Sequence, residues 1–492
     1  MSEPKSLLLV TVDCLRADHT GFMGYPQPTT PFLDQLAAES MVFPKAITAG
    51  APTYYSFPGI LASRFPLALG REVVGIAPGE PTLATALQQA GYRTAAYVAA
   101  NPYLSSRFGY AQGFEVFHDF LSEQLPYARE APRARTRLNR QIAELAHKVS
   151  LLGRLYDDLY FQYCQRIALP RNETWNSLRR FPAANVLADH ACGWLKSLDD
   201  EPFFLWLHFM DPHAPYYPPA EALKAMGKER ASPTRGRYLN ATWNGDPGAR
   251  RLRKSRDEIV VLHDAGIRWV DNQLARLVES LRSSSRWNSC MFVFTADHGE
   301  EFLDHGGRFH PPSCAYQEIL QVPLLVRVPG AEKKALSESP FSLVHLAPTI
   351  LEALGMDAPE EFEGRDYWSE VQSGEGWDLA VSESIGRCTN PMDAQKRLGA
   401  RVLVVQDRKF KLVLGFDNQQ EDLFDLQRDP HELEPVPIGA ERSARGRLLR
   451  AALHHLERRP SQRRREFAIR ARIHQIGLEW DHSKMRSETP AS

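Results

Sequence analysis

Long hydrophobic runs are missing from this sequence. No apolar stretch approaches the roughly 18 residues that a membrane-spanning helix needs. The first apolar stretch, from Leu7 to Val12, follows Lys5 and runs directly into Asp13, unlike a cleavable secretory signal. If this stretch is a core strand, its removal would destroy the fold. We therefore predict a cytoplasmic protein without a transmembrane segment.

Cysteine is also scarce. The 492 residues contain six cysteines, with no CxxC pair and no zinc-like clustering: Cys14, Cys164, Cys192, Cys290, Cys314 and Cys388. Such scattered cysteines predict reduced thiols. Apolar residues make up 43% of the chain and charged residues 24%, which is typical of a globular protein with a large core. This composition excludes disordered, collagen-like, coiled-coil and disulfide-scaffold classes.

A strong overall charge is absent, although the charge is unevenly distributed. The formal net charge is −1, but from Glu441 onward 13 Lys and Arg stand against 6 Asp and Glu. This basic tail, residues 441–492, is predicted to be helical. It could bind an anionic partner, dock on the rest of the chain, or form a solvated arginine-rich helix. No segment resembles a nucleic-acid-binding module, so we expect no nucleic-acid partner.

Strands and helices alternate along most of the chain. Apolar runs predict buried strands at residues 6–12, 93–100, 203–210, 290–295 and 321–328. Helical patterns occupy residues 31–40, 81–90, 183–198 and 257–281. This alternation predicts an α/β fold, a mostly parallel sheet with helices on both faces. In such sheets ligands bind at the carboxyl ends of the strands, where Asp13, His208, Asp297 and His298 are expected.

Two segments depart from this alternation. Residues 121–182 are polar and Arg-rich, and they predict a helical insert within a catalytic domain spanning residues 1–375. Between residues 402 and 426 apolar and polar residues alternate, which predicts a small antiparallel sheet. We therefore expect a C-terminal β subdomain at residues 376–440, followed by the basic tail.

Two carboxylates, a histidine and a threonine carry the predicted chemistry. Asp13 follows the first strand, Asp297 and His298 follow a later one, and Thr53 lies where a loop enters a helix. Together they could form a divalent-metal site with the hydroxyl as nucleophile. Each also has an ordinary explanation, because an aspartate after a strand is often a cap or turn residue and a threonine is a common N-cap.

The order of the motifs resembles the sulfatase family of the alkaline phosphatase superfamily. The opening VTVDCLRADHTGFMGY is similar to that family's amino-terminal signature, and TAGAPTYYSFPGILASRFP to its nucleophile region. FFLWLHFMDPHAPYYPP, FTADHGEEFLDHG and KFKLVLGFDNQQEDLFDLQRDP continue the match, which covers residues 6–435 apart from the insert. The resemblance implies an alkaline phosphatase-like fold with a small C-terminal antiparallel sheet.

The resemblance also implies roles for individual residues. These are the metal ligands Asp13, Asp297 and His298, the nucleophile and ligand Thr53, the catalytic histidines His213 and His310, and the substrate contact Asn101. The two catalytic histidines would contact the transferred group or protonate the leaving oxygen. We interpret His208 as a core histidine, and His305 fits either a structural or a functional role.

The nucleophile region departs from that of typical sulfatases. Those enzymes carry C-x-P-x-R, whose Cys or Ser is oxidised to formylglycine, whereas residues 53–57 here are TYYSF. Threonine cannot yield that aldehyde, so we expect a covalent intermediate on unmodified Thr53, as in the phosphodiesterase and phosphoryl-transferase branches. Ser56 is the alternative nucleophile. Cys14, where many relatives have a second aspartate, disfavours a four-carboxylate calcium cage and permits a transition metal.

These features predict a metal-dependent hydrolase or transferase that cleaves sulfate, phosphate or phosphonate esters. We expect one divalent ion, Mn²⁺, Zn²⁺ or Ca²⁺, and a small-molecule, glycan or lipid ester as substrate. A second interpretation is a two-metal nucleotide pyrophosphatase or phosphodiesterase whose second ion would be held by His213, His310 and Asp211. A third is a degenerate binding or scaffold protein that uses its basic tail.

Overall fold

The structure is a computed structural model that describes residues 5–71, 73–122, 173–245, 250–333, 336–377, 379–417, 419–458 and 462–487. Most of the predicted helical insert, and Cys164 with it, lies outside these ranges.

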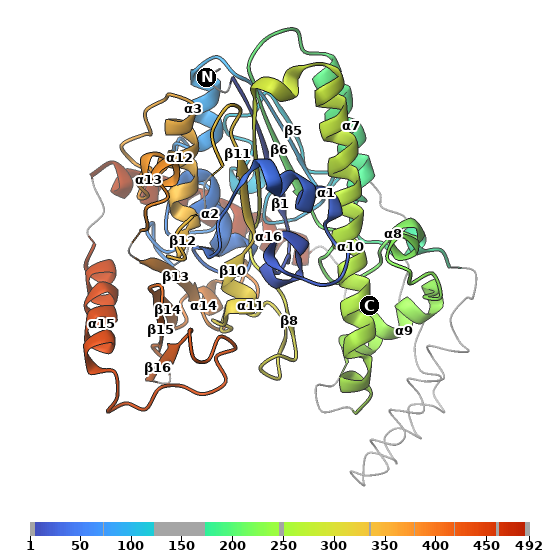
Figure 1. Cartoon of the computed structure of the whole chain (residues 1–492). Helices are drawn as coiled ribbons and strands as arrows, with labels where there is room; N and C mark the ends of the chain where they lie inside the picture. Colours follow the sequence, from blue (N-terminus) through green and yellow to red (C-terminus); the bar gives the residue numbers. More distant parts are fainter. Residues whose placement is uncertain are drawn as a thin grey trace.

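A seven-stranded sheet forms the centre of the molecule (Figure 1). Its order is β2 (Met41–Val42), β11 (Leu324–Arg327), β7 (Cys290–Ala296), β1 (Ser6–Val12), β6 (Phe203–Phe209), β4 (Arg93–Val98) and β5 (Val116–His118). The pairs from β7 to β5 are parallel, and β11 is antiparallel to both of its neighbours. Every residue of β1, β6 and β7 is buried, as their continuous apolar sequences require. The predicted α/β fold is confirmed.

Helices cover both faces of this sheet (Figure 1). On one side lie α1 (Pro31–Leu36), α7 (Ala184–Lys196) and α10 (Arg250–Ser283), and on the other α2 (Thr53–Ala62), α3 (Leu83–Gln89) and α12 (Leu346–Ala353). Helix α10 begins seven residues before the predicted 257, because its first turns pack on the neighbouring helices α8 (Ala220–Ala225) and α9 (Pro233–Trp243).

Short elements complete the main domain. They are β3 (Ala46–Ile47), α6 (Trp175–Leu178), β8 (Glu301–Phe302), β9 (Arg308–Phe309), α11 (Gln317–Leu320), β10 (Gln321–Val322), β12 (Phe341–Ser342), α13 (Trp368–Ser373) and α14 (Ala394–Arg397). The pair β8 and β9 forms a small hairpin immediately after β7, and this hairpin carries part of the site described below.

A second, antiparallel sheet follows near the C-terminus. Its strands are β13 (Ala380–Ile385), β14 (Arg401–Gln406), β15 (Phe410–Gly415) and β16 (Gln420–Asp425). Val404, Val413 and Phe424 face the α11 segment, whereas Leu403 and Leu412 face the opposite side. The predicted small antiparallel sheet is confirmed.

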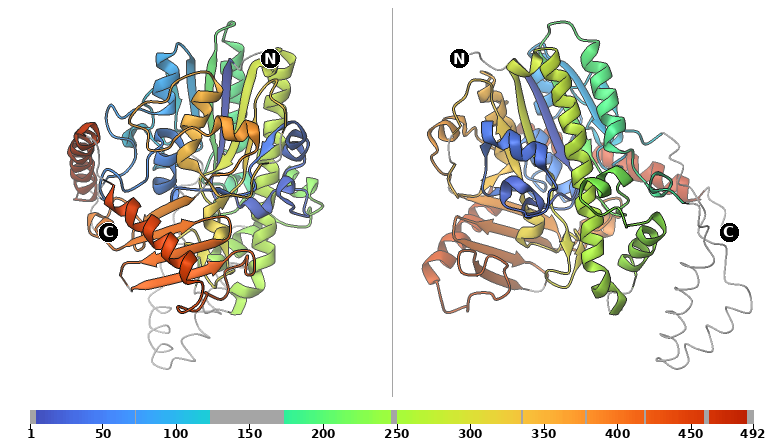
Figure 2. Two further views of the ribbon diagram at one scale, coloured as in Figure 1. Left: turned by 60° about the vertical axis from the view of Figure 1, so that its left-hand side comes forward. Right: turned by 45° about the vertical axis from the view of Figure 1, so that its right-hand side comes forward.

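The basic tail forms two helices that contact the rest of the chain. Helix α15 (Arg442–Glu457) lies across the C-terminal sheet and buries Leu448 there (Figure 2). Helix α16 (Gln462–Ser487) packs Phe467 and Ala471 on the segment around Val73. Docking on the chain's own surface is therefore the interpretation that these contacts support. The predicted domain limits stay a prediction.

The described residues include no helix that is both long and apolar enough to cross a membrane. In the same part of the chain the cysteines form no disulfide, and Cys14, Cys192, Cys290, Cys314 and Cys388 are all free thiols.

Candidate active site

Parallel pairing brings the predicted ligands to one edge of the sheet. Val12, the last residue of β1, is paired with Ala296 of β7 on one side and with Phe209 of β6 on the other. The next residue of β1 and the next of β7 are Asp13 and Asp297, so their side chains meet beyond the strand ends. This is the edge at which ligands bind in parallel α/β sheets.

Asp13, Asp297 and His298 form a buried cluster. Nε2 of His298 lies 3.8 Å from Oδ1 of Asp13 and 3.5 Å from Oδ2 of Asp297. The Nδ1 atom of His298 lies 2.8 Å from the carbonyl oxygen of Gly299, to which it can donate a hydrogen bond. Such a bond leaves the Nε2 lone pair directed at the carboxylates, which is how a metal-binding histidine is oriented.

The charges in this cluster fit a cation. Oδ2 of Asp297 is buried and accepts no hydrogen bond from the described part of the chain. Burial and then the charge of Asp13 raise the pKa of Asp297. Burial opposes ionisation of Asp13 as well, but His213, His208 and His298 hold the pKa of Asp13 well below its ordinary value. Two buried carboxylates and an imidazole are a ligand set that suits a divalent ion.

Thr53 lies directly beside the cluster. It is the first residue of α2, and its Oγ1 is 3.4 Å from Oδ2 of Asp13 and 3.4 Å from Nε2 of His298. A helix N-terminus favours an anionic group because free backbone N–H groups and the helix dipole point at it. The predicted nucleophile, the predicted ligands and a favourable anion position therefore coincide.

Two further predicted residues touch Asp13. The side-chain amide of Asn101 donates a 2.9 Å hydrogen bond to Oδ2 of Asp13, so Asn101 orients this carboxylate as well as bordering the cavity. His208 is fully buried, as we expected of a core histidine. However, its Nε2 lies 3.5 Å from the same Asp13 oxygen, so His208 also contributes to the charge balance of the site.

Cys14 turns toward the ligands. Its φ of 59° is in the left-handed region, which a cysteine adopts only when its surroundings hold it there. In this conformation its backbone N–H donates to Oδ1 of Asp297 at 3.4 Å and its thiol to Oδ1 of Asp13 at 3.0 Å. Burial, followed by Glu300, Asp13 and Asp297, raises the pKa of the Cys14 thiol.

His310 contacts a buried glutamate, Glu300, that the sequence did not predict as part of the site. Nδ1 of His310 lies 3.2 Å from Oε1 of Glu300, and the hydroxyl of Tyr216 donates to Oε2 of Glu300 at 3.1 Å. Although burial opposes its ionisation, His310 lowers the pKa of Glu300. A carboxylate behind an imidazole orients the ring. The only sequence signal was the acidic pair after His298 in DHGEE.

A cavity of about 500 Å³ opens above these residues. Thr53, Asn101, His213 and His310 all border it, which brings the predicted catalytic residues together. The imidazole rings of His213 and His310 are 5.3 Å apart, and those of His310 and His298 are 4.5 Å apart. The outer wall is formed by aromatic and basic side chains, among them Tyr54, Tyr103, Arg180, Phe181, Arg308 and Phe309.

Three residues considered from the sequence lie outside this cavity. The Ser56 hydroxyl donates to the carbonyl oxygen of Thr53 at 3.0 Å and is fully buried. His305 stacks on Tyr316 and lies 2.6 Å from Glu318. Asp211 accepts a 2.5 Å hydrogen bond from Arg179. Their contacts give each of them a structural role.

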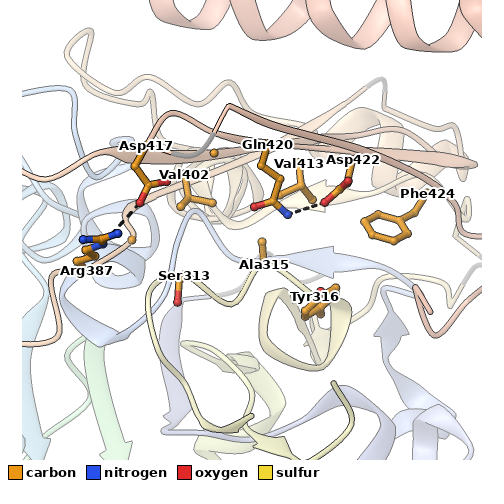
Figure 3. Close-up of a pocket in the computed structure, with 12 residues that line it drawn as sticks. Ser313, Ala315, Tyr316, Arg387, Val402, Val413, Asp417, Gln420, Asp422 and Phe424 are labelled. Carbon is orange, nitrogen blue, oxygen red and sulfur yellow. Dashed lines mark hydrogen bonds and ion pairs between the residues drawn. The ribbon is translucent and has the colours of Figure 1, made fainter. Parts of the chain in front are cut away.

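Another cavity, of about 230 Å³, lies between the C-terminal sheet and the segment that follows His310 (Figure 3). One wall is formed by Val402, Val413 and Phe424 of the C-terminal sheet, and an ion pair between Arg387 and Asp417 at 3.6 Å lies at one end. None of the predicted catalytic residues or ligands borders it. The chemistry is therefore concentrated in the cavity above Thr53.

Comparisons with known proteins match this chain to sulfatases. Residues 5–356 match the family model described as Sulfatase, and residues 307–458 match the one described as N-sulphoglucosamine sulphohydrolase, C-terminal. An arylsulfatase from Clostridium perfringens is 24% identical over 466 residues, which cover 87% of this chain and 89% of that protein.

Solved structures share the fold. The phosphonate monoester hydrolase SpPMH from Silicibacter pomeroyi has a TM-score of 0.66 and 20% identity, and the match covers 92% of this chain and 94% of that one. A protein solved in complex with its substrate D-glucosamine-2-N,6-O-disulfate also has a TM-score of 0.66, with 16% identity over 94% of this chain and 98% of that one.

Proposed function

The chain belongs to the sulfatase family and is an ester hydrolase, and from this premise we propose that it cleaves its ester through unmodified Thr53 with the help of one divalent cation. The observation that carries the proposal is the position of the Thr53 hydroxyl, 3.4 Å from both Asp13 and His298 on the floor of the cavity. Phosphate and phosphonate esters are the substrates that this nucleophile favours, and sulfate esters are the alternative.

The proposed cation ligands are Asp13, Asp297, His298 and Thr53. A divalent cation held there would lower the pKa of the hydroxyl and neutralise charge on the ester. Asn101 keeps the Asp13 carboxylate in position through its 2.9 Å hydrogen bond. The cluster fits Mn²⁺, Zn²⁺ or Ca²⁺, and the neighbouring Cys14 favours the softer ions.

The first chemical step in this proposal is attack by Oγ1 of Thr53 on phosphorus or sulfur, after the hydroxyl has lost its proton to solvent. The new ester bond to Thr53 forms as the bond to the leaving oxygen breaks. His310, which Glu300 orients from 3.2 Å away, then gives a proton to that oxygen. His213 lies across the same cavity and supports the charge of the transferred group.

The second step requires attack by water or an acceptor alcohol on the covalent intermediate. The bond to Oγ1 of Thr53 breaks as the new bond forms, and the proton of the incoming oxygen passes to His310. A threonine ester carries no second hydroxyl on the same carbon, so the transferred group cannot be expelled as it is from formylglycine. The incoming oxygen must therefore attack phosphorus or sulfur itself. This requirement supports phosphoryl and phosphonyl groups over sulfate, and it leaves both hydrolysis and transfer open as outcomes.

The organic part of the substrate would lie against the outer wall of the cavity. Tyr54, Tyr103 and Phe181 offer ring faces, and Arg180 adds a positive charge. Aromatic faces favour planar groups or sugar rings. We therefore propose a ring-bearing small molecule or glycan rather than a lipid as the leaving group, in a cytoplasmic enzyme with reduced thiols.

The two alternative functions have less support. Arg179 already neutralises Asp211 through a 2.5 Å hydrogen bond to Oδ1, and within the described residues no group of closely spaced ligand atoms combines Asp211 with His213 or His310. A degenerate scaffold protein would not be expected to keep a complete set of ligands, nucleophile and proton donor.

A matched set of esters tests the proposed function. Phosphate monoester, phosphate diester, phosphonate monoester and sulfate ester of the same aryl alcohol should be compared by kcat/KM after each candidate metal is added. We expect phosphate or phosphonate esters to be cleaved fastest, with Asp297→Ala as the inactive control. Efficient cleavage of the sulfate ester alone would contradict the proposed preference.

A further inference from the structure

The outer face of α16 carries three exposed isoleucines. Ile469, Ile473 and Ile476 are 59%, 67% and 66% exposed. Their spacing of four and three residues places them on one side of the helix. Buried Phe467 and Ala471 lie on the opposite side, against the main domain. The isoleucines are therefore directed outward by the same packing that holds the helix.

The orientation of α16 is fixed by polar contacts as well. Arg464 forms an ion pair with Glu363 at 2.7 Å, and Arg463 forms one with Glu361. Nε2 of His474 lies 2.9 Å from the carbonyl oxygen of Arg107. Because α16 is already folded against the main domain, binding to its outer face would carry no free-energy cost for folding the helix.

Positive charge surrounds the apolar stripe. Residues 462–477 contain five arginines and one glutamate. At 100° per residue, Arg465 and Arg472 lie along one side of the isoleucine stripe and Arg470 along the other, and all three are exposed. A helix with an apolar stripe between arginines binds anionic surfaces, because the apolar side chains enter the surface layer while the guanidinium groups remain at the charged headgroups.

We propose that the outer face of α16 docks on an anionic phospholipid bilayer, with the helix axis parallel to the membrane plane. The size of the stripe favours a bilayer over a protein partner. Among the side chains of α16 that the structure describes, three along two turns fall far short of the roughly 800 Å² that each partner contributes to a stable protein interface. Shallow insertion combined with several arginines is sufficient for reversible binding to anionic lipid. Two copies of this face would repel each other through their arginines.

The inner face of α16 contacts a segment next to the catalytic cavity. The Arg107 carbonyl that contacts His474 follows closely after Asn101, Pro102 and Tyr103, which border the cavity. Figure 2 shows α16 on the outside of the molecule, apart from α15 and the C-terminal sheet. Bilayer docking would therefore concentrate the enzyme at a charged surface without burying the C-terminal sheet.

Vesicle sedimentation tests this proposal on the full chain. Wild type should bind vesicles that contain phosphatidylglycerol, bind pure phosphatidylcholine weakly, and dissociate at high salt. The triple variant Ile469→Ser, Ile473→Ser, Ile476→Ser should partition at least about tenfold more weakly. The matched control Leu398→Ser, Leu433→Ser, Leu453→Ser removes three exposed leucines that lie outside α16. It should bind as wild type does.

Wild type, the isoleucine variant and the leucine control should turn over a soluble aryl ester equally well. A failure of vesicle binding can therefore be distinguished from a failure of the proposed chemistry. Equal binding by the isoleucine variant and wild type would overturn the proposal, as would the absence of wild-type binding to anionic vesicles. Concentration-dependent dimerisation that the isoleucine variant abolishes, without vesicle binding, would assign the face to a second copy instead.

Discussion

The Sγ atom of Cys14 lies 3.2 Å from Nδ1 of His310, so a thiol connects the metal-ligand cluster with the histidine of the cavity. The same sulfur lies 3.0 Å from Oδ1 of Asp13. Sulfur at this position changes which cation the site should prefer, because thiolates bind soft ions more strongly than they bind Ca²⁺.

We expect Co²⁺ and Zn²⁺ to recruit the Cys14 thiolate as an additional ligand beside the four proposed ones, and therefore to bind more tightly than Ca²⁺. The Co²⁺-loaded protein should show a thiolate-to-cobalt charge-transfer absorption that Cys14→Ser abolishes. Because the pKa of this thiol is raised, loss of its proton should make cobalt affinity increase with pH. A wild-type cobalt spectrum without the charge-transfer band would contradict the expectation.

Asp297→Ala should remove the cation without unfolding the protein. A ligand that binds only the folded state raises the melting temperature, so added metal should stabilise wild type but not this variant. Metal content by mass spectrometry and turnover should both fall to background. Asp257→Ala, a highly exposed acidic residue on α10, is the control. Full metal content in the Asp297 variant would exclude Asp297 as a ligand.

Asp271 should make stability depend on pH. Its carboxylate accepts hydrogen bonds from the backbone N–H groups of Phe32 and Leu33 at 3.0 and 2.9 Å, and burial raises its pKa to about 7. A carboxyl group whose pKa is higher in the folded state binds its proton more tightly there. Its contribution is therefore complete below its unfolded pKa of about 4 and is lost as pH rises through about 7.

Denaturant titrations of wild type and Asp271→Asn between about pH 5 and pH 8 check this prediction. The free energy of unfolding of wild type should fall relative to that of the variant as pH rises. Parallel pH profiles would show that the folded-state pKa of Asp271 is close to its ordinary value.

Truncation should separate the two helices of the basic tail. The whole tail follows the last sulfatase-like motif, so we expect it to be dispensable for chemistry, but Leu448 of α15 is fully buried on the C-terminal sheet and should matter for stability. A chain that ends at Arg458 should retain turnover of a soluble ester. A chain that ends at Ala440 should melt at a lower temperature, since each exposed Leu costs about 1.5–3 kcal/mol. Equal melting temperatures for the two truncated chains would contradict this division.

The sheet and the position of the ligand cluster could be predicted from the sequence because buried parallel strands leave a clear pattern. The apolar runs that end at Asp13 and Asp297 indicate both the strands and the edge where they meet. Glu300 could not be identified in this way. A glutamate shortly after a strand has the same local pattern whether it is solvated or buried, and its role depends on the β8–β9 hairpin that returns His310 to it.

The basic tail shows the same limit. Its arginine content indicates a solvated or anion-binding helix, whereas the residues that attach α16, Phe467 and Ala471, are only one pair of apolar residues four positions apart. Composition records the charge of the whole segment, and only the tertiary contacts distinguish its inner face from its outer face.

Thr53 is the centre of the account, and mass spectrometry of a trapped intermediate tests it most directly. Rapid acid quenching during turnover of an aryl phosphate or phosphonate ester, followed by peptide mapping, should find the added group on Thr53. Thr53→Ala should lose about 10³-fold or more in turnover and form no adduct, whereas Thr53→Ser should keep some of both. An adduct on Ser56, or an active Thr53→Ala enzyme, would contradict the account.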